Sequence, residues 1–217
     1  MILLSDNDLV VKLAQCDLLQ ETLVSLESGA NDCFVLSSLP YSLRLKDPDK
    51  SIEKYVGSVQ AYERICGFLE QCSVLNDAKV DFDLIDHMQK IDEVDPGEFA
   101  LFLHANDLHG SGEQFKILTG DKRALSAICS YEHFDTAFSF LPDNVDCLES
   151  SMLRLIDYAG YEFVNERVSV ARQQVIEKKY DKVLRFAFGE GRDEKHCTEC
   201  LRSYMLDVVK LFNPQMG

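Results

Sequence analysis

Two short apolar runs of this chain end in aspartate. The run MILLS (1–5) is followed by Asp6 and, two residues later, by Asp8, and the run FKILTG (115–120) is followed directly by Asp121. Carboxylates are the ligands that Mg²⁺ and Mn²⁺ prefer, because these hard cations bind oxygen donors. A cation held by a few carboxylates keeps positions open for water and phosphate, which is what hydrolysis of a phosphodiester requires.

A third acidic position lies at a helix-start pattern. Asp95 fits a helix N-cap, a proline follows it, and Glu98 has the spacing of a capping box before the apolar run FALFLHA. Capping alone explains each of these acids singly, and the aspartates after the two apolar runs can cap the helices that follow them. Capping does not require two strands to end in an acid, so we favour a functional acidic site.

Four apolar runs predict strands, and helical spacing of apolar residues predicts helices between them. The predicted strands cover 1–5, 33–39, 115–120 and 136–142. The predicted helices cover 9–18, 21–26, 51–72, 81–91, 95–105 and 122–130. Because strands that alternate with helices form a parallel sheet covered on both faces, we expect a three-layer α/β/α fold. Ligands of such sheets bind at the carboxyl ends of the strands, where Asp6 and Asp121 meet if their strands are neighbours.

The last third of the chain is helical in pattern. Beyond residue 142 no further strand is predicted, and apolar residues recur at helical spacing over 147–188 and 196–212. We therefore expect an α/β domain over 1–144 and a helical C-terminal extension over 145–217 that packs on it. No flexible linker separates the two parts in the sequence.

The net charge of −15 is unevenly distributed. Residues 1–144 carry 11 Lys and Arg against 25 Asp and Glu, whereas residues 145–217 carry 11 against 12. An acidic body repels nucleic acid at long range. A nucleic-acid-binding function therefore requires bound metal ions or a local basic surface.

The extension supplies a candidate basic surface. If residues 167–185 form one helix, six cations fall within an arc of about 140° on one face. These cations are Arg167, Arg172, Lys178, Lys179, Lys182 and Arg185. We expect the face to contact a phosphate backbone through Lys178, Lys182 and Arg185. The alternative is a solvated helix face without a partner.

Cysteine use and hydropathy favour a cytoplasmic protein. Eight cysteines are spread through periodic apolar segments, which is typical of buried free thiols in a reducing compartment. The start MILLSDND reaches two aspartates before an apolar signal-peptide core can develop. No apolar run approaches the roughly 18 residues that cross a membrane, so we expect no membrane partner.

Together, the acidic motifs resemble those of the PIN-domain nuclease family. Asp6-Asn7-Asp8 is similar to the family's first motif, Asp95-Pro96-Gly97-Glu98 to its second, and ILTGDKRAL with Asp121 to its third. The order and spacing of the motifs also match, over about residues 1–142. The resemblance implies a PIN-like domain that hydrolyses phosphodiester bonds, with RNA as substrate and Mg²⁺ or Mn²⁺ as cofactor.

The resemblance also implies a role for single residues. Asp6, Glu98 and Asp121 would be the catalytic, metal-binding acids. Asp8 would take the small polar position of the metal site, two residues after the first acid. Thr119, shortly before Asp121, would orient that carboxylate or contact a phosphate.

The sequence departs from the family pattern after the second predicted strand. A glutamate is expected within PYSLRLKDP (40–48), where this chain has Arg44 and Lys46. The alternative function is therefore a PIN-like interaction module that no longer cuts, with the helical extension binding a protein partner or a second copy of the chain. We favour a metal-dependent endoribonuclease, because the three acidic motifs occur together.

Overall fold

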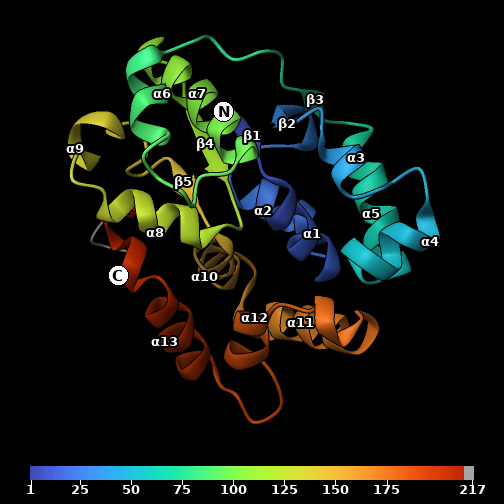
Figure 1. Ribbon diagram of the computed structural model, residues 1–217. Coiled ribbons are helices and arrows are strands. Elements are labelled where there is room, and N and C mark those ends of the chain that lie inside the picture. The colour runs from blue at the N-terminus through green and yellow to red at the C-terminus, as the bar shows by residue number, and fades with distance from the viewer. Residues whose placement is uncertain (213–217) are drawn as a thin grey trace.

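Five parallel strands form the centre of the molecule (Figure 1). The computed structural model describes residues 1–212, and its sheet has the strand order β3-β2-β1-β4-β5. The strands are β1 (Ile2–Ser5), β2 (Cys33–Val35), β3 (Ser73–Val74), β4 (Phe115–Leu118) and β5 (Val145–Asp146). Every neighbouring pair is parallel. The α/β class expected from the sequence is confirmed.

Helices cover both faces of the sheet, as the three-layer prediction requires. The helices up to β5 are α1 (Asn7–Gln15), α2 (Leu19–Ser25), α3 (Leu39–Ser42), α4 (Pro48–Ser51), α5 (Val59–Leu69), α6 (Phe82–Met88), α7 (Pro96–Gly110), α8 (Lys122–Ser130) and α9 (Phe134–Ala137), with the short turns η1 (Ala30–Asp32) and η2 (Ile52–Val56). Right-handed crossovers place the helices after β1 and β2 on one face and those after β3 and β4 on the other, because the connections run in opposite directions along the sheet. The packing agrees, since α1 contacts α5 while α9 contacts α6 and α8.

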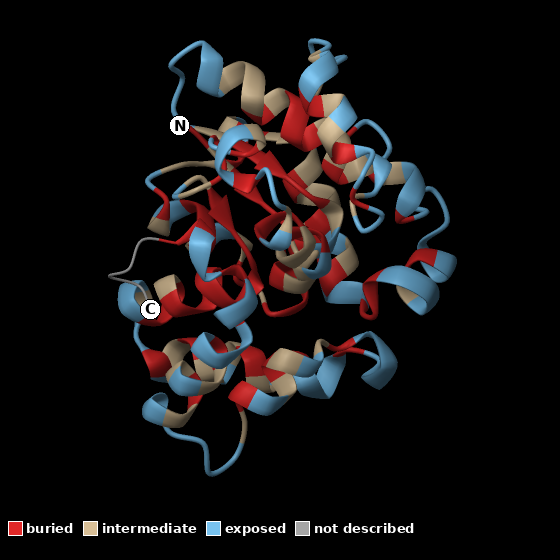
Figure 2. Cartoon of the chain, turned by 60° about the vertical axis from the view of Figure 1, so that its left-hand side comes forward, coloured by how far each residue is buried: buried red, intermediate tan, exposed pale blue. Residues whose placement is uncertain are grey.

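The core is centred on β1 and β4, which lie in the middle of the sheet. Leu3 and Leu4 of β1 and Ile117 of β4 are at most 1% exposed. Strands buried on both faces have nearly continuous apolar sequences, which is why both runs were recognisable. In Figure 2 the central strands are buried, and exposed residues lie mainly on the outer helices and loops; the edge strand β3 is exposed at both of its residues.

The strand predicted over 136–142 is wrong. Residues 134–137 form α9, turns follow, and the fifth strand is β5 at 145–146. Phe138, Phe140 and Leu141 are nevertheless buried, because the loop packs into the core. An apolar run indicates burial, and it does not by itself distinguish a strand from a packed loop. The short strand β3 was not predicted.

The helix predicted over 51–72 is interrupted at Gly57. The chain makes one π-helical turn, η2, and Gly57 then takes a left-handed conformation with φ 88°. Ser58 begins α5 by accepting a hydrogen bond from the backbone N–H of Ala61 at 3.2 Å. Apolar periodicity continues across the break, so the sequence pattern did not reveal it.

The C-terminal extension is helical but broken into shorter pieces than expected. Its helices are α10 (Leu148–Ala159), α11 (Tyr161–Gln174), α12 (Lys182–Ala187) and α13 (Glu194–Tyr204), with 3-10 turns η3 (Glu177–Lys179) and η4 (Leu206–Leu211). α10 packs on α2, and η4 packs on α8. Lys210 donates to the carbonyl of Cys129 at 2.9 Å, and Asp143 N–H donates to the carbonyl of Leu211 at 2.9 Å. The end of the described chain therefore returns to the sheet domain.

Two further sequence features have structural counterparts. No helix within residues 1–212 is long and apolar enough to cross a membrane. All eight cysteines are free thiols; five are buried, and Cys66, Cys72 and Cys200 are partly exposed. Burial raises the pKa of the Cys16 and Cys147 thiols to about 12, so both stay protonated and unreactive.

Gly57 provides a test of how the extension is attached. A Cβ at this position would lie 2.8 Å from Cγ1 of Val175 and 3.0 Å from Cβ of Lys179, in a backbone conformation that L-residues avoid. We expect Gly57→Ala to lower the free energy of unfolding by about 2 to 4 kcal/mol, from the sum of overpacking and backbone strain. Gly67→Ala is the matched control, because nothing lies within 4 Å of a Cβ there. In urea unfolding, equal stability of the two variants would contradict this account.

Candidate active site

Asp6 and Asp121 lie at the carboxyl ends of the two central strands. β1 and β4 are direct neighbours, and Asp6 N–H donates to the carbonyl of Leu118 at 2.8 Å. The strand order reverses between these two strands, and ligands of open α/β sheets bind in the crevice at such a point. Both aspartates line one cavity of about 510 Å³ there.

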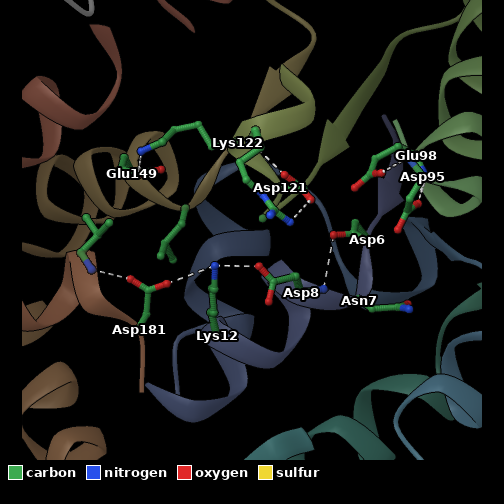
Figure 3. Close-up of a pocket in the computed structure, with 14 residues that line it drawn as sticks. Asp6, Asn7, Asp8, Lys12, Asp95, Glu98, Asp121, Lys122, Glu149 and Asp181 are labelled. Atoms are coloured by element: carbon green, nitrogen blue, oxygen red, sulfur yellow. Dashed lines mark hydrogen bonds and ion pairs between the residues drawn. The ribbon is translucent and has the colours of Figure 1, made fainter. Parts of the chain in front are cut away.

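Glu98 lies in the wall of the same cavity, at the start of α7. Its Oε2 accepts a hydrogen bond from Asp95 N–H at 2.9 Å, and Asp95 Oδ1 accepts from the N–H groups of Gly97 and Glu98 at 2.6 and 2.9 Å. The capping box predicted from the sequence is therefore present. Figure 3 shows the Glu98 carboxylate turned toward Asp6, so the residue caps its helix and faces the cavity.

Asp121 also caps a helix while lining the cavity. Its Oδ1 accepts hydrogen bonds from the N–H groups of Arg123 and Ala124 at 2.9 and 3.2 Å, at the start of α8. Thr119 lies behind it: its side chain is 1% exposed, and its Oγ1 accepts from Asp121 N–H at 3.1 Å. Thr119 thus positions the turn that carries Asp121. A direct phosphate contact by Thr119, the other role that the resemblance implied, does not fit a side chain so buried.

Asp8 lies in the cavity and is held there by Lys12. Lys12 Nζ is 2.6 Å from Asp8 Oδ2 and 3.1 Å from Asp181 Oδ2, so it joins α1 to the extension. The Asp8 carboxylate lies directly over Gly120, where any Cβ would overlap with it. The glycine of ILTGD is therefore needed for the close approach of this carboxylate to the β4–α8 turn.

Two acids of the extension also line the cavity, and the sequence analysis missed both. Glu149, in the first turn of α10, is 3% exposed, and its Oε1 is 2.5 Å from Lys122 Nζ. Asp181 caps α12 by accepting from the N–H of Val183 at 2.7 Å. Glu149 follows β5 by three residues, and because β5 was not predicted, there was no reason to look for an acid at the start of α10.

The cavity carries an excess of negative charge. Its lining has seven acids against three cations: Asp6, Asp8, Asp95, Glu98, Asp121, Glu149 and Asp181 against Lys12, Lys122 and Arg123. Among the described residues, no ion pair involves Asp6 or Glu98. Burial, with the nearby charge of Asp8, raises the pKa of Asp6 to about 6. Burial, with Asp95 and Asp6 nearby, raises the pKa of Glu98 to about 8.

The donor atoms of this cavity suit a hard divalent cation. Asp6, Glu98 and Asp121 offer only carboxylate oxygens, which favours Mg²⁺ or Mn²⁺ over a softer metal. As oriented, no three His, Cys, Asp or Glu side chains within residues 1–212 stand close enough to hold a metal ion. Binding a cation therefore requires these carboxylates to move together, and the charge of the cation would have to offset the increased repulsion between them.

The basic stripe predicted over 167–185 is wrong as a single helix face. α11 ends at Gln174, the chain is extended at Val175, and α12 begins only at Lys182. The arc of six cations assumed a continuous helix through residues 175–181, which is not formed. The six cations therefore do not share one helix face.

The six cations have different environments. Arg167 forms an ion pair with Asp17. Arg185 donates to the Glu177 carbonyl at 2.9 Å and lies 3.2 Å from its carboxylate. Lys182 is exposed and does not line the acidic cavity. Of the three residues expected to contact nucleic acid, Lys178 lines a cavity that adjoins the acidic site, whereas Lys182 and Arg185 line neither of these two cavities.

No family model, curated protein or solved structure matches this chain in comparisons with each of the three. The function has therefore to be inferred from the acidic cavity and from the motifs that form it. Those motifs come from separate elements, namely the ends of β1 and β4 and the start of α7.

The raised pKa of Asp6 predicts a stabilising substitution. The folded protein binds this proton more tightly than the unfolded chain, so stability falls as the pH rises from 3.8 to about 6. Asp6→Asn removes the charge facing Asp8 and Glu98 and retains an N-cap side chain. In the presence of a chelator we expect it to raise the free energy of unfolding by about 2 to 3 kcal/mol at pH 8 and by little near pH 4.

Urea unfolding at the two pH values measures this difference. Asp92→Asn, at an exposed aspartate in a turn, is the matched control for loss of one charge. If the Asp6→Asn variant is less stable than the wild type at pH 8, the charge on Asp6 does not destabilise the folded protein.

Proposed function

We propose that this chain is a PIN-like endoribonuclease that depends on a divalent cation. The proposal is carried by the position of Asp6 and Asp121 at the ends of two neighbouring parallel strands, at the point where the strand order reverses, with Glu98 in the wall of the same cavity. Phosphodiester hydrolysis needs such a cluster of carboxylates on an open crevice. RNA is the substrate that the PIN-like motifs imply.

Three residues would hold the cation, namely Asp6, Glu98 and Asp121. When bound, Mg²⁺ or Mn²⁺ supplies a nucleophilic water at neutral pH and stabilises charge on the phosphate oxygens. The capping bonds hold Asp121 and Glu98 at fixed places on their helices, so each carboxylate keeps an oxygen available to the cavity. Thr119 fixes the backbone of the turn that carries Asp121.

Arg123 is placed to bind the substrate phosphate. Its Nη2 lies 3.5 Å from Asp121 Oδ2 at the rim of the cavity, and its side chain is 88% exposed. A guanidinium in this position can form charge-assisted hydrogen bonds to a phosphate that approaches the carboxylates. Arg123 therefore offsets part of the repulsion that an acidic cavity exerts on RNA.

The competing function is an interaction module that does not cut. It is favoured by ion pairs that neutralise acids of the cavity, among them Lys12 with Asp8 and Asp181, and Lys122 with Glu149. It is also favoured by Arg44 and Lys46, which stand where the family pattern has an acid. In such a module the remaining acids serve as helix caps, and divalent cations have no effect on the protein.

Cation binding distinguishes these two functions by thermal unfolding. Because the carboxylates come together only in the folded chain, Mn²⁺ should stabilise the native state by mass action, by about 2.7 kcal/mol at a hundredfold excess over Kd. We expect Asp121→Asn to abolish most of the rise in Tm and Asp92→Asn to retain it. A wild-type Tm that is indifferent to millimolar Mn²⁺ would favour the interaction module.

Cleavage tests the proposal directly. With Mn²⁺, the wild type should cut a fluorescently labelled RNA internally, and Asp121→Asn should lower kcat by about a hundredfold or more. Chelator should abolish the activity, and Asp92→Asn should leave it unchanged. Equal cleavage by the wild type and Asp121→Asn would assign the activity to a contaminant and overturn the proposal.

A further inference from the structure

A second cavity adjoins the acidic one on the other side of α1. It has a volume of about 470 Å³, and it shares Asn7, Asp8 and Lys12 with the acidic cavity. The two cavities are therefore contiguous, with the first turns of α1 as their common wall. A molecule long enough to pass this wall can occupy both at once.

The charge of this second cavity is opposite to that of the first. Its lining contains Lys12, Lys54, Lys178 and Lys179, and Asp8 is its one acid. Among residues 1–212, no ion pair engages Lys178 or Lys179, and Lys54 pairs only with the exposed Glu53. The cavity is thus a local basic surface on an acidic protein, with two ammonium groups available to an anion.

The cations of the second cavity come from segments that the fold ties together. Gln15 is 3% exposed, and its Nε2 donates to the carbonyls of Val56 at 2.7 Å and of Lys179 at 3.4 Å. Ile176 N–H donates to the carbonyl of Gly57 at 2.9 Å. The segments that carry Lys54 and Lys179 are therefore fixed to α1 and to each other, so the backbone positions of these lysines are held close together.

An aromatic side chain lies among these lysines. Tyr55 lines the second cavity and is 38% exposed, although its neighbour Val56 is fully buried. Exposed aromatic rings interleaved with cations are typical of surfaces that bind single strands, since each base can stack while the phosphates bind the cations. A duplex hides the faces of its bases, and an acidic peptide does not require an aromatic platform.

We propose that this second cavity is a subsite for the phosphate backbone of a single nucleic-acid strand, next to the bond that is cut. Lys178 and Lys179 bind phosphates, Tyr55 stacks on a base, and the strand passes over Asn7 into the acidic cavity. The inference rests on the proposed nuclease function and adds the substrate form and its recognition. It also replaces Lys182 and Arg185 of the sequence-based stripe with Lys179 and Tyr55.

Binding of a labelled single-stranded RNA of about 12 nucleotides tests the subsite. The measurement is fluorescence anisotropy in the Asp121→Asn background, so that the probe is not cut. We expect Lys178→Gln/Lys179→Gln to weaken binding about tenfold and to flatten the log–log salt dependence by about 1.4, or about 0.7 for each lost phosphate contact. Tyr55→Leu should weaken binding about fivefold with an unchanged salt slope, because stacking releases no counterions.

The matched control is Lys195→Gln/Arg202→Gln, which removes the same charge from exposed positions of α13 outside both cavities. We expect this control to weaken binding less than threefold, the effect of net charge alone at about 0.15 M salt. Equal losses in the two double variants would overturn the subsite. If a duplex of equal length binds as tightly as the single strand, the single-strand assignment is wrong. If the single-stranded RNA shows no salt-dependent binding, the phosphate subsite itself is wrong.

Kinetics separate this inference from the proposed function. In the otherwise wild-type protein, Lys178→Gln/Lys179→Gln should raise KM for the long strand by a larger factor than KM for a dinucleotide, which is too short to span both cavities. If KM for the long strand does not change, the subsite is wrong and the nuclease assignment stands. If the wild type binds the strand through these lysines and does not cut it, the nuclease assignment is wrong and the subsite stands.

Discussion

The gathering of carboxylates at one edge of the sheet is the constraint on which this structure depends. Like charges in a buried crevice repel each other, and each loses hydration energy. The fold offsets this cost by placing every acid of the cavity at a helix N-terminus, where unpaired N–H groups and the helix dipole favour negative charge. The acids lie at the starts of α1 (Asp6 and Asp8), α7 (Asp95 and Glu98), α8 (Asp121), α10 (Glu149) and α12 (Asp181).

Capping and function are therefore not alternatives in this protein. In a parallel α/β sheet, each strand ends at the edge where the next helix begins, so residues that cap those helices converge on one crevice. Asp121 illustrates both roles, since Oδ1 accepts two backbone hydrogen bonds while the residue lines the cavity. Capping compensates the charges incompletely, because burial still raises the pKa of Asp6 to about 6 and that of Glu98 to about 8. A bound cation would offset the repulsion that remains between these carboxylates.

The parts of the fold that the sequence predicted are those with strong local signals. β1 and β4 are buried on both faces and end in polar residues, so their boundaries and Asp6 and Asp121 followed directly. β5 has two residues, and the more apolar run at 136–142 concealed it, so Glu149 was missed with it. The basic stripe failed for a different reason: the buried Val175 and Tyr180 keep an apolar spacing that fits a helix, although the chain is extended at Val175, so helical periodicity does not detect the break.

The C-terminal extension contributes residues to both cavities, so the net charge of the whole chain does not describe the charge within either cavity. It contributes Glu149 and Asp181 to the acidic cavity, and Lys178 and Lys179 to the basic one. Charges farther apart than about 8 Å are largely screened at physiological ionic strength. The net charge of −15 therefore affects solubility and long-range approach, whereas any ligand of these cavities would experience mainly the charged groups that line them. Lys12 forms ion pairs with Asp8 of α1 and with Asp181 of the extension. These two contacts hold the acidic and the basic cavity in a fixed position relative to each other.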